Sequence, residues 1–170
     1  RADIMDLASK HSQRRVLFDG GTFSAHPAAM RAGKLLLEYL AREEATVYPR
    51  LGELGERLRV GIEKAFAEHG VLARCTGWGN EVVPGSSLIQ VHFPHREDVD
   101  LDNPDLVWDP RYSDAALRER VLKLGLLLRD VNTSHGLGAV SLAHTDEDLQ
   151  QVVEGCAWVA EQIAEARGKT

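Results

Sequence analysis

A glycine pair followed by a threonine and a serine lies between an apolar segment, residues 16–18, and a predicted helix. The pair begins at Gly20, and the run ends at Ser24. Adjacent glycines let the backbone approach a ligand closely, and the neighbouring hydroxyl and N–H groups can hold an anion. Pro27 suits the first position of the helix, because its missing N–H is not needed there. The run could therefore bind a phosphate, and a simple turn is the alternative.

A second group of polar residues has a spacing that is seen in metal sites. His92 and His95 lie three residues apart, and Asp98 and Asp100 follow them. No partner cluster accompanies them in this predicted loop, so a hydrogen-bonded or solvated role is favoured over metal binding. We therefore predict no metal site.

Composition limits the classes of function. The 170 residues are 44% hydrophobic and 27% charged, which is ordinary for a globular domain. The net charge of −6 argues against a nucleic-acid or anionic-membrane surface. No apolar run approaches the roughly 20 residues that cross a bilayer. Cys75 and Cys156 are isolated; we expect Cys156 to be buried on a helix, and the protein to be cytoplasmic without disulfides.

Hydrophobic periodicity predicts the order of the helices and strands. Helices are expected over residues 27–43, over 46–69 and after two predicted caps, Asp114 and Thr145. Strands are expected over residues 72–76, 87–93 and 139–144. The acidic segment 94–112 lacks a period and is expected to be a surface loop. The predicted class is α/β, with helices packed on a small, antiparallel sheet of about three strands.

The same patterns predict which sides of the helices are buried. Pro49 should lie in the first turn of the helix over 46–69, Gly70 should end it, and Arg59 should lie on its solvated side. The helix after Asp114 should bury Leu117, Val121, Leu124 and Leu128. The last helix should bury Val152, Cys156, Val159 and Ile163. In the loop, the predicted anchor is Leu106, Val107 and Trp108.

Three segments resemble one family of enzymes. The run Asp19–Gly33 closely resembles the Gly-Thr-Phe/Leu-Ser-x-Asn-Pro-x-x-Met-x-x-Gly segment of class III pyridoxal-phosphate aminotransferases, especially the glutamate-1-semialdehyde aminomutase branch. The run Ala139–Asp148 resembles the closing strand and last helix of that branch. Arg1–Asp6 resembles a segment just beyond the family's Schiff-base lysine. The three segments follow the family's order.

The resemblance implies the C-terminal small domain of a fold-type I enzyme, together with the tail of its large domain. Residues 1–26 would be the tail of the large cofactor-binding domain and would carry the phosphate loop. Residues 27–60 would be connecting helices, and residues 61–170 the small domain.

The family's motif also implies particular site residues. Gly21 and Thr22 match the pair that binds the phosphate of pyridoxal 5'-phosphate in the neighbouring subunit, and Ser24 matches the motif serine. His26 stands where the family usually has Asn. His135 could border the substrate entrance, or it could be a simple turn histidine. His144 matches a family histidine and is favoured as a structural capping contact rather than a catalytic base.

No catalytic residue is expected in this chain, since none of its five lysines, Lys10, Lys34, Lys64, Lys123 and Lys169, stands in the context of the Schiff-base lysine. The resemblance therefore implies the C-terminal portion of a homodimeric aminotransferase or aminomutase that acts on a small-molecule amino-group donor or acceptor. The chain alone should be inactive. A non-catalytic remnant or accessory domain that binds a partner is the alternative. An arginine and proline pair that clamps the substrate carboxylate in acetylornithine-type enzymes is absent near residues 136–141, which favours the aminomutase-like branch or an amine transaminase.

Overall fold

The computed structural model describes residues 24–81, 83–133 and 137–168. The chain divides into two compact units, Arg1–Glu43 and Glu44–Thr170. The predicted division into residues 1–26, 27–60 and 61–170 stays a prediction.

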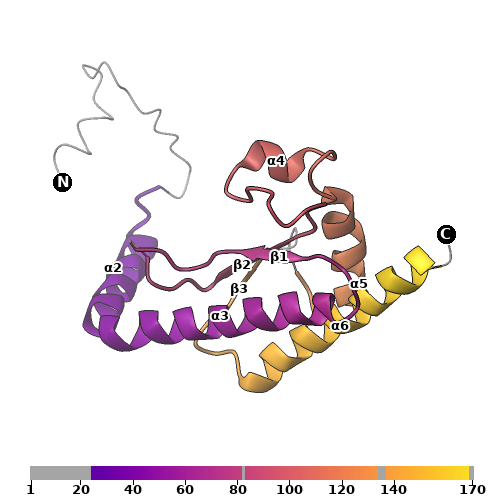
Figure 1. Ribbon diagram of the computed structural model, residues 1–170. Helices are drawn as coiled ribbons and strands as arrows, with labels where there is room; N and C mark the ends of the chain where they lie inside the picture. Colours follow the sequence, from indigo (N-terminus) through magenta and orange to yellow (C-terminus); the bar gives the residue numbers. More distant parts are fainter. Residues whose placement is uncertain (1–23, 82, 134–136, 169–170) are drawn as a thin grey trace, which may run out of the picture. The chain divides into compact units, whose positions relative to one another are not determined.

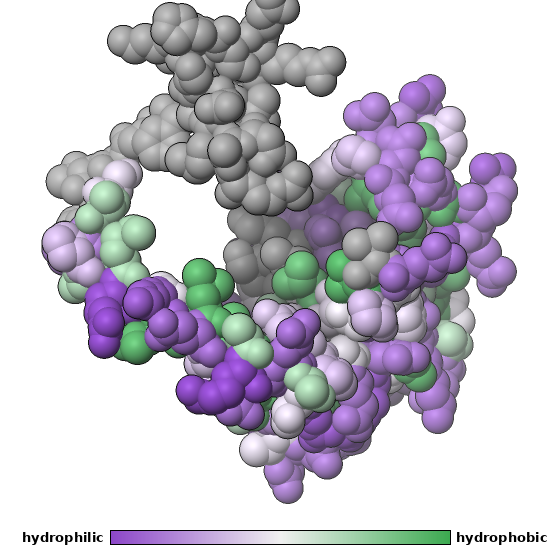
Figure 2. All heavy atoms as spheres, turned by 90° about the vertical axis from the view of Figure 1, so that its left-hand side faces the viewer, coloured by the Kyte–Doolittle hydropathy of each residue, from purple (hydrophilic) through white to green (hydrophobic). Residues whose placement is uncertain are grey.

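In the first unit, helix α2 spans Pro27–Arg42 and confirms the helix expected over 27–43. Pro27 occupies the first helical position, where it interrupts no hydrogen bond. No residue of α2 is buried within the chain. Its large exposed hydrophobic side chains are Met30, Leu35, Leu36, Leu37 and Tyr39. Hydrophilic side chains predominate on the face of the chain drawn in Figure 2, with separate hydrophobic groups exposed between them.

The second unit begins with helix α3, Glu44–Ala67. It starts two residues earlier than expected, so Pro49 lies in the second turn rather than the first. Gly70, whose φ of 67° suits a residue without a side chain, follows the end of α3 as predicted. Burial follows the expected spacing along Leu54, Leu58 and Ile62.

Three short strands form one antiparallel sheet in the described part of the chain: β1 (Arg74–Thr76), β2 (Leu88–His92) and β3 (Leu137–Ala139), in the order β1-β2-β3. Cys75 pairs with Val91, and Ile89 pairs with Gly138. The long helices α3 and α6 (Asp146–Gly168) lie on one side of the sheet in Figure 1, and the short helix α4 (Pro104–Trp108) lies on the other. The predicted class, helices on a small antiparallel sheet, is confirmed.

The core lies between the sheet and these two long helices. Ile89, Val91 and Cys75 are buried on the helix side, because alternate residues of a strand point to opposite faces. Phe66 of α3 and Phe93 pack edge to face, with ring centroids 5.2 Å apart. From α6 come the predicted Cys156, Val159 and Ile163, all buried.

The segment over 94–112 is not wholly irregular, since it contains helix α4. Asn103 caps this helix, and its side chain accepts a hydrogen bond from the Asp105 N–H at 3.0 Å. Val107 is buried, which confirms its predicted role as an anchor. Pro94 and Ser113 are paired at the two ends of the segment, so it leaves and rejoins the sheet at one place.

The buried side of the next helix was predicted wrongly. Residues Leu117–Leu122 form a π-helix, η2, which continues into α5, Lys123–Leu127. The buried residues are Arg118, Leu122, Gly125 and Leu126, whereas Val121, Leu124 and Leu128 are exposed. The helix carries two apolar sides, and the one that contains an arginine faces inward. A Cβ at Gly125 would lie 2.5 Å from Val159, so this side meets α6 closely.

The last strand also differs from its prediction over 139–144. Strand β3 ends at Ala139, and Ser141 and His144 close a turn instead. The backbone N–H of His144 donates to the Ser141 carbonyl at 3.2 Å, and the Ser141 N–H donates to His144 Nδ1 at 2.9 Å. These two hydrogen bonds fix the turn before α6.

Replacing Gly55 by alanine is expected to destabilise the second unit. A Cβ at Gly55 would overlap the Ser86 carbonyl oxygen. Overpacking costs about 1–3 kcal/mol, which exceeds the gain of up to about 1 kcal/mol in helix propensity. Gly33→Ala is the matched control, because a Cβ built there meets no described atom within 4 Å beyond its own helix backbone, and it should raise helicity. Urea unfolding monitored by circular dichroism measures the stability of both variants. A Gly55→Ala variant as stable as the parent chain, or more stable, would contradict the close packing of Gly55 against Ser86.

Candidate functional site

Only part of the candidate phosphate loop belongs to the described residues. Gly21 and Thr22 lie outside them. Ser24 is exposed and lies in a turn with Ala25, whose φ is 57°. The chain then enters α2 at Pro27, and the first turn of α2 has no acidic residue. The positive end of a helix without a nearby carboxylate is compatible with an anion.

The other candidate residues from the sequence are histidines, and the structure describes two of the three below. His135 lies outside the described residues. His144 is exposed and bonds to Ser141 within its own turn, which is a structural contact as expected, although it caps no helix. His95 is exposed, and its Nε2 is 2.9 Å from the Pro110 carbonyl oxygen. Within the described ranges, no three His, Cys, Asp or Glu residues are grouped as a metal would require.

The lysines of the described residues are not buried. Lys34 pairs with Glu38 at 3.6 Å, and Lys64 pairs with Glu68 at 3.8 Å, both on exposed helix surfaces. Lys123 is half-buried on α5. Lys10 and Lys169 lie outside the described residues. None of the three described lysines has the enclosed surroundings of a lysine that acts as a nucleophile.

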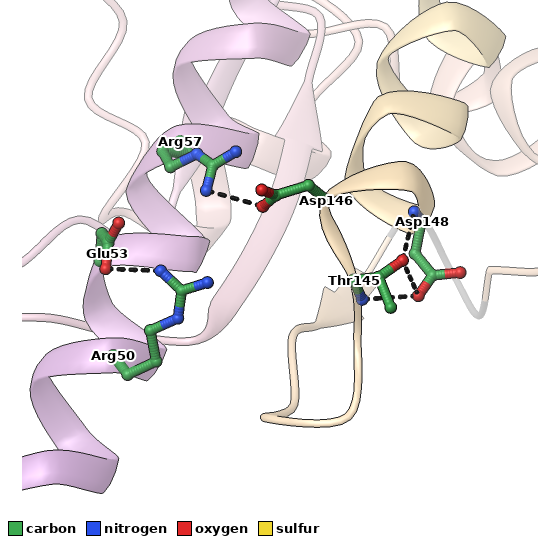
Figure 3. Close-up of polar contacts among 6 residues, drawn as sticks. All are labelled: Arg50, Glu53, Arg57, Thr145, Asp146 and Asp148. Atoms are coloured by element: carbon green, nitrogen blue, oxygen red, sulfur yellow. Dashed lines mark hydrogen bonds and ion pairs between the residues drawn. The ribbon is translucent and has the colours of Figure 1, made fainter.

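A capping box lies at the start of α6, where the sequence predicted Thr145 as the cap. The Asp148 N–H donates to Thr145 Oγ1 at 3.2 Å, and the Thr145 N–H donates to Asp148 Oδ2 at 2.7 Å (Figure 3). The Thr145 N–H, together with the Thr145 hydroxyl that donates to the same oxygen at 3.0 Å, holds the pKa of Asp148 below its usual range. Asp146, the residue after Thr145, accepts from Arg57 of α3 at 2.9 Å, so an ion pair joins the start of α6 to α3 (Figure 3).

A buried polar cluster, which sequence reasoning missed, lies between β2 and η2. Arg118 is 1% exposed, and its Nη1 lies 3.2 Å from His92 Nδ1. A guanidinium only donates, so Nδ1 accepts; a neutral His92 then carries its proton on Nε2 and donates to Thr76 Oγ1 at 3.1 Å. Arg118 also lies 4.3 Å from the centre of the Trp108 ring and pairs with Glu119 at 2.8 Å.

This arrangement determines the charge of His92. Burial, together with the positive charges of Arg118 and Arg74, lowers the pKa of His92 to about 4. The imidazole is therefore neutral at pH 7 and acts as a connector rather than a proton donor to a ligand. Arg118 shares the buried side of its helix with Leu122 and Leu126, whereas the sequence prediction chose the other apolar side.

A second buried arginine lies on α3, where the sequence had suggested a solvated position. Arg59 is 1% exposed and donates to the carbonyls of Ser86 at 3.1 Å and Leu88 at 2.8 Å. Its guanidinium lies 4.9 Å from the centre of the Trp78 ring. Burial lowers the pKa of Arg59, but an arginine remains protonated. The signal available in the sequence was Gly55, one turn earlier, which allows the backbone at Ser86 to approach.

Cys75 and Cys156 are free and buried, which confirms the prediction for Cys156. Burial raises the pKa of Cys75 well above its usual range and that of Cys156 to about 12, so neither is a ready nucleophile. In the ranges the structure covers, no helix combines the length and apolar character needed to cross a membrane.

The comparisons with known proteins find one group of relatives. The chain is 28% identical over 154 residues to a glutamate-1-semialdehyde 2,1-aminomutase of Akkermansia muciniphila, covering 91% of the chain and 32% of the relative. It is 31% identical over 147 residues to the same enzyme of Hyperthermus butylicus, covering 81% of the chain and 29% of the relative. The chain thus spans about a third of the length of the curated relatives it matches. No family model matches it.

Solved structures agree with this result. A β-phenylalanine aminotransferase from Variovorax paradoxus has a TM-score of 0.66 and 29% identity, over 99% of this chain and 34% of its own. An omega-transaminase from Sphaerobacter thermophilus has a TM-score of 0.66 and 27% identity, over 97% and 34%. A transaminase with PLP bound shares the fold at 22% identity and a TM-score of 0.63. The resemblance predicted from the sequence is confirmed.

His92 should make stability depend on pH in the acid range. With a pKa of about 4 when folded and 6.5 when unfolded, His92 binds fewer protons in the folded state between these values. Its contribution to the free energy of unfolding is therefore complete above pH 6.5 and is lost as the pH falls to 4. At about 1.4 kcal/mol per pKa unit, the loss amounts to about 3 kcal/mol. Urea unfolding at several pH values should give a shallower dependence for His92→Gln, whereas the exposed control His95→Gln should follow the parent chain. If the stability of His92→Gln fell with decreasing pH as steeply as that of the parent chain, the burial argument would be refuted.

Proposed function

We propose that this chain, a relative of glutamate-1-semialdehyde aminomutases and of aminotransferases, is the C-terminal portion of a pyridoxal-phosphate enzyme that transfers an amino group. The observation that carries the proposal is that the likeness covers nearly the whole chain but only about a third of each relative. Domains that share a fold can differ in function. Here the likeness extends to sequence identities of 27–31% with enzymes that move amino groups.

The described residues fit a phosphate at the start of α2. Ser24 and Ala25 form a turn immediately before the helix, no acidic side chain occupies its first turn, and Ser24 is exposed. Gly21 and Thr22 precede this turn in the sequence, and we assign them to the cofactor phosphate of the neighbouring subunit in a homodimer. Backbone N–H groups and a hydroxyl at a helix N-terminus suit that task. Ser24 is assigned as a further polar contact.

The remaining chemistry belongs to the cofactor and to residues outside this chain. When bound, pyridoxal phosphate supplies the electron sink for amino transfer. The chain's part is to hold its phosphate, while the amine that binds the cofactor covalently comes from the preceding part of the polypeptide. The described lysines, Lys34, Lys64 and Lys123, are paired at the surface or only half-buried, which supports this division of labour.

The 170-residue chain alone is expected to retain no pyridoxal phosphate covalently. The physical reason is that a stable Schiff base needs an enclosed amine, and the described lysines offer none. Incubation with the cofactor, borohydride reduction and peptide mass spectrometry measure the outcome. Low labelling scattered over several lysines is expected. Stoichiometric labelling of one lysine would contradict the proposed division.

In the complete enzyme, Thr22→Val should weaken retention of the cofactor and leave the fold intact. The loss is a hydrogen bond to a charged group, about 1.5–3 kcal/mol, or about 10- to 150-fold in affinity. Thr22→Ser is the matched control, because it keeps the hydroxyl. Cofactor affinity is measured by equilibrium dialysis of both variants.

Mixed dimers test whether the phosphate site is shared between subunits. One subunit carries Thr22→Val, and the other carries a substitution of the Schiff-base lysine. If Thr22 serves the neighbouring subunit, both lesions fall in one site, and the other site keeps its lysine and its threonine. Such dimers should recover about half of the activity of the unmodified enzyme. Absence of recovery would show that Thr22 serves its own subunit.

The alternative is a non-catalytic remnant or accessory domain that binds a partner. A parent gene that encodes no upstream lysine-bearing domain would favour this alternative instead.

A further inference from the structure

Residues 95–112 form a strap whose two ends are tied together. The strap contains α4 and lies on the side of the sheet opposite α3 and α6 (Figure 1). At its neck, the His95 N–H donates to the Tyr112 carbonyl at 2.8 Å. Of the strap residues, all of which the structure describes, only Val99 and Val107 are buried. A segment with a closed neck and few buried side chains can detach by local unfolding while the rest of the unit stays folded.

Two arginines hold the strap against the sheet. Arg74 of β1 donates from Nη1 to the carbonyls of Glu97 and Val99, at 2.7 and 2.8 Å. Arg118 of η2 stacks on the ring of Trp108, the last residue of α4, and the centre of the ring is 4.3 Å from its guanidinium carbon. Arg74 therefore binds the first part of the strap, and Arg118 ties α4 to the rest of the unit.

The position of Arg118 depends in turn on His92. Nη1 of Arg118 donates to Nδ1 of His92 at 3.2 Å, and the other ring nitrogen of His92 donates to Thr76 Oγ1. Glu119 accepts from Nε of Arg118 at 2.8 Å, while Nη2 is buried without a hydrogen-bond partner among the described residues. The acceptor on His92 and the ring of Trp108 therefore fix the end of the Arg118 side chain.

A proton on His92 removes that acceptor. Both ring nitrogens of an imidazolium are donors, so two donors and two positive charges would face each other across the 3.2 Å contact with Arg118. The charges that act on His92 are those of Arg118 from η2 and Arg74 from β1, and both are positive. α4 contributes only the uncharged ring of Trp108, and Glu119 is bound to Arg118. His92 is held in the middle strand, whereas the long side chain of Arg118 can carry its charge out to water.

We propose that this cluster makes the strap an acid-sensitive element: when His92 binds a proton, Arg118 leaves Trp108, and the strap detaches from the sheet while the core stays folded. The core does not need the strap, because its buried side chains pack between the sheet and the helices α3, α5 and α6. Detachment lets water reach His92, which is 3% exposed when the strap is closed. Protonation and opening therefore favour each other. This inference does not depend on the proposed cofactor chemistry.

The size and direction of the effect follow from the protons that His92 binds in each form. The pKa of His92 is about 4 when the strap is closed, and 6.5 is the ordinary value for an exposed histidine. Between these values the open form binds more protons, so the ratio of open to closed straps rises as the pH falls. From pH 7 to pH 5 the expected rise is about 20-fold.

The test is hydrogen–deuterium exchange of the 170-residue chain at pH 7 and pH 5, read by mass spectrometry and corrected for the intrinsic exchange rate at each pH. Peptides from the strap should lose protection about 20-fold at pH 5. At both pH values they should exchange faster than peptides from α3 and α6. Dilute urea should speed exchange in α3 and α6 and leave the strap nearly unchanged, because a local opening exposes little surface.

Three variants separate this cluster from other causes of pH dependence. His92→Asn places a neutral acceptor where Nδ1 lies, so its strap should keep most of its protection at pH 5. His95→Gln is the matched control, because it removes an exposed histidine of the strap itself, and it should follow the parent chain. Trp108→Ala changes a side chain that is 57% exposed, so the fold should persist by circular dichroism. Its strap should lose about two- to thirtyfold in protection at pH 7, the range expected for an arginine–aromatic contact.

Four results would each overturn the proposal. They are strap protection that does not change with pH in the parent chain, an equal loss of protection in His92→Asn, loss of the pH dependence in His95→Gln, and unchanged strap protection in Trp108→Ala. Exchange of the strap as slow as that of α3 and α6 would also overturn it, because the strap would then open only when the whole unit unfolds.

Discussion

The close contact between α3 and the backbone at Ser86 is the constraint on which the second unit depends. Gly55 allows this contact, and Arg59, one turn later, donates to the carbonyls at Ser86 and Leu88. Leu88 begins β2, the middle strand, so these bonds fix where the sheet starts relative to α3. Because β2 pairs with both other strands, its position sets theirs.

Both buried arginines stack on a tryptophan ring and link distant segments of the chain. Arg59 lies over Trp78 and Arg118 over Trp108, and each holds together segments far apart in the sequence. A guanidinium is weakly hydrated and can stack on an aromatic ring, so its burial costs less than that of an ammonium. Arg118 and His92 join η2 to β2, and the Trp108 contact adds α4 to the same cluster. Arg118 therefore joins η2 and α4 to β2, whereas Arg59 joins α3 to the start of the same strand.

These arginines also mark the limit of prediction from the sequence. Periodicity identified α2, α3 and α6, because each long helix has one dominant apolar side or a clear cap, such as Thr145. It failed for η2 and α5, where two apolar sides compete and the arginine-bearing one is buried. The first two strands were predicted slightly too long, and the last was predicted too late, since β3 spans Leu137–Ala139 and a turn closed by Ser141 and His144 follows it. No local pattern encodes a partner that lies 26 residues away, as His92 does for Arg118.

The candidate phosphate loop is a prediction of a different kind. A phosphate loop depends on local backbone geometry, so its residues are contiguous and a motif can represent them. A complete amino-transfer site needs an amine, a ring contact and a carboxylate from distant segments, so no single motif can represent it. A cavity beside β3 is likewise lined by residues far apart in the sequence, because it arises from packing among helices and strands. A motif can therefore predict a local phosphate contact, whereas a cavity assembled by packing is visible only in the folded structure.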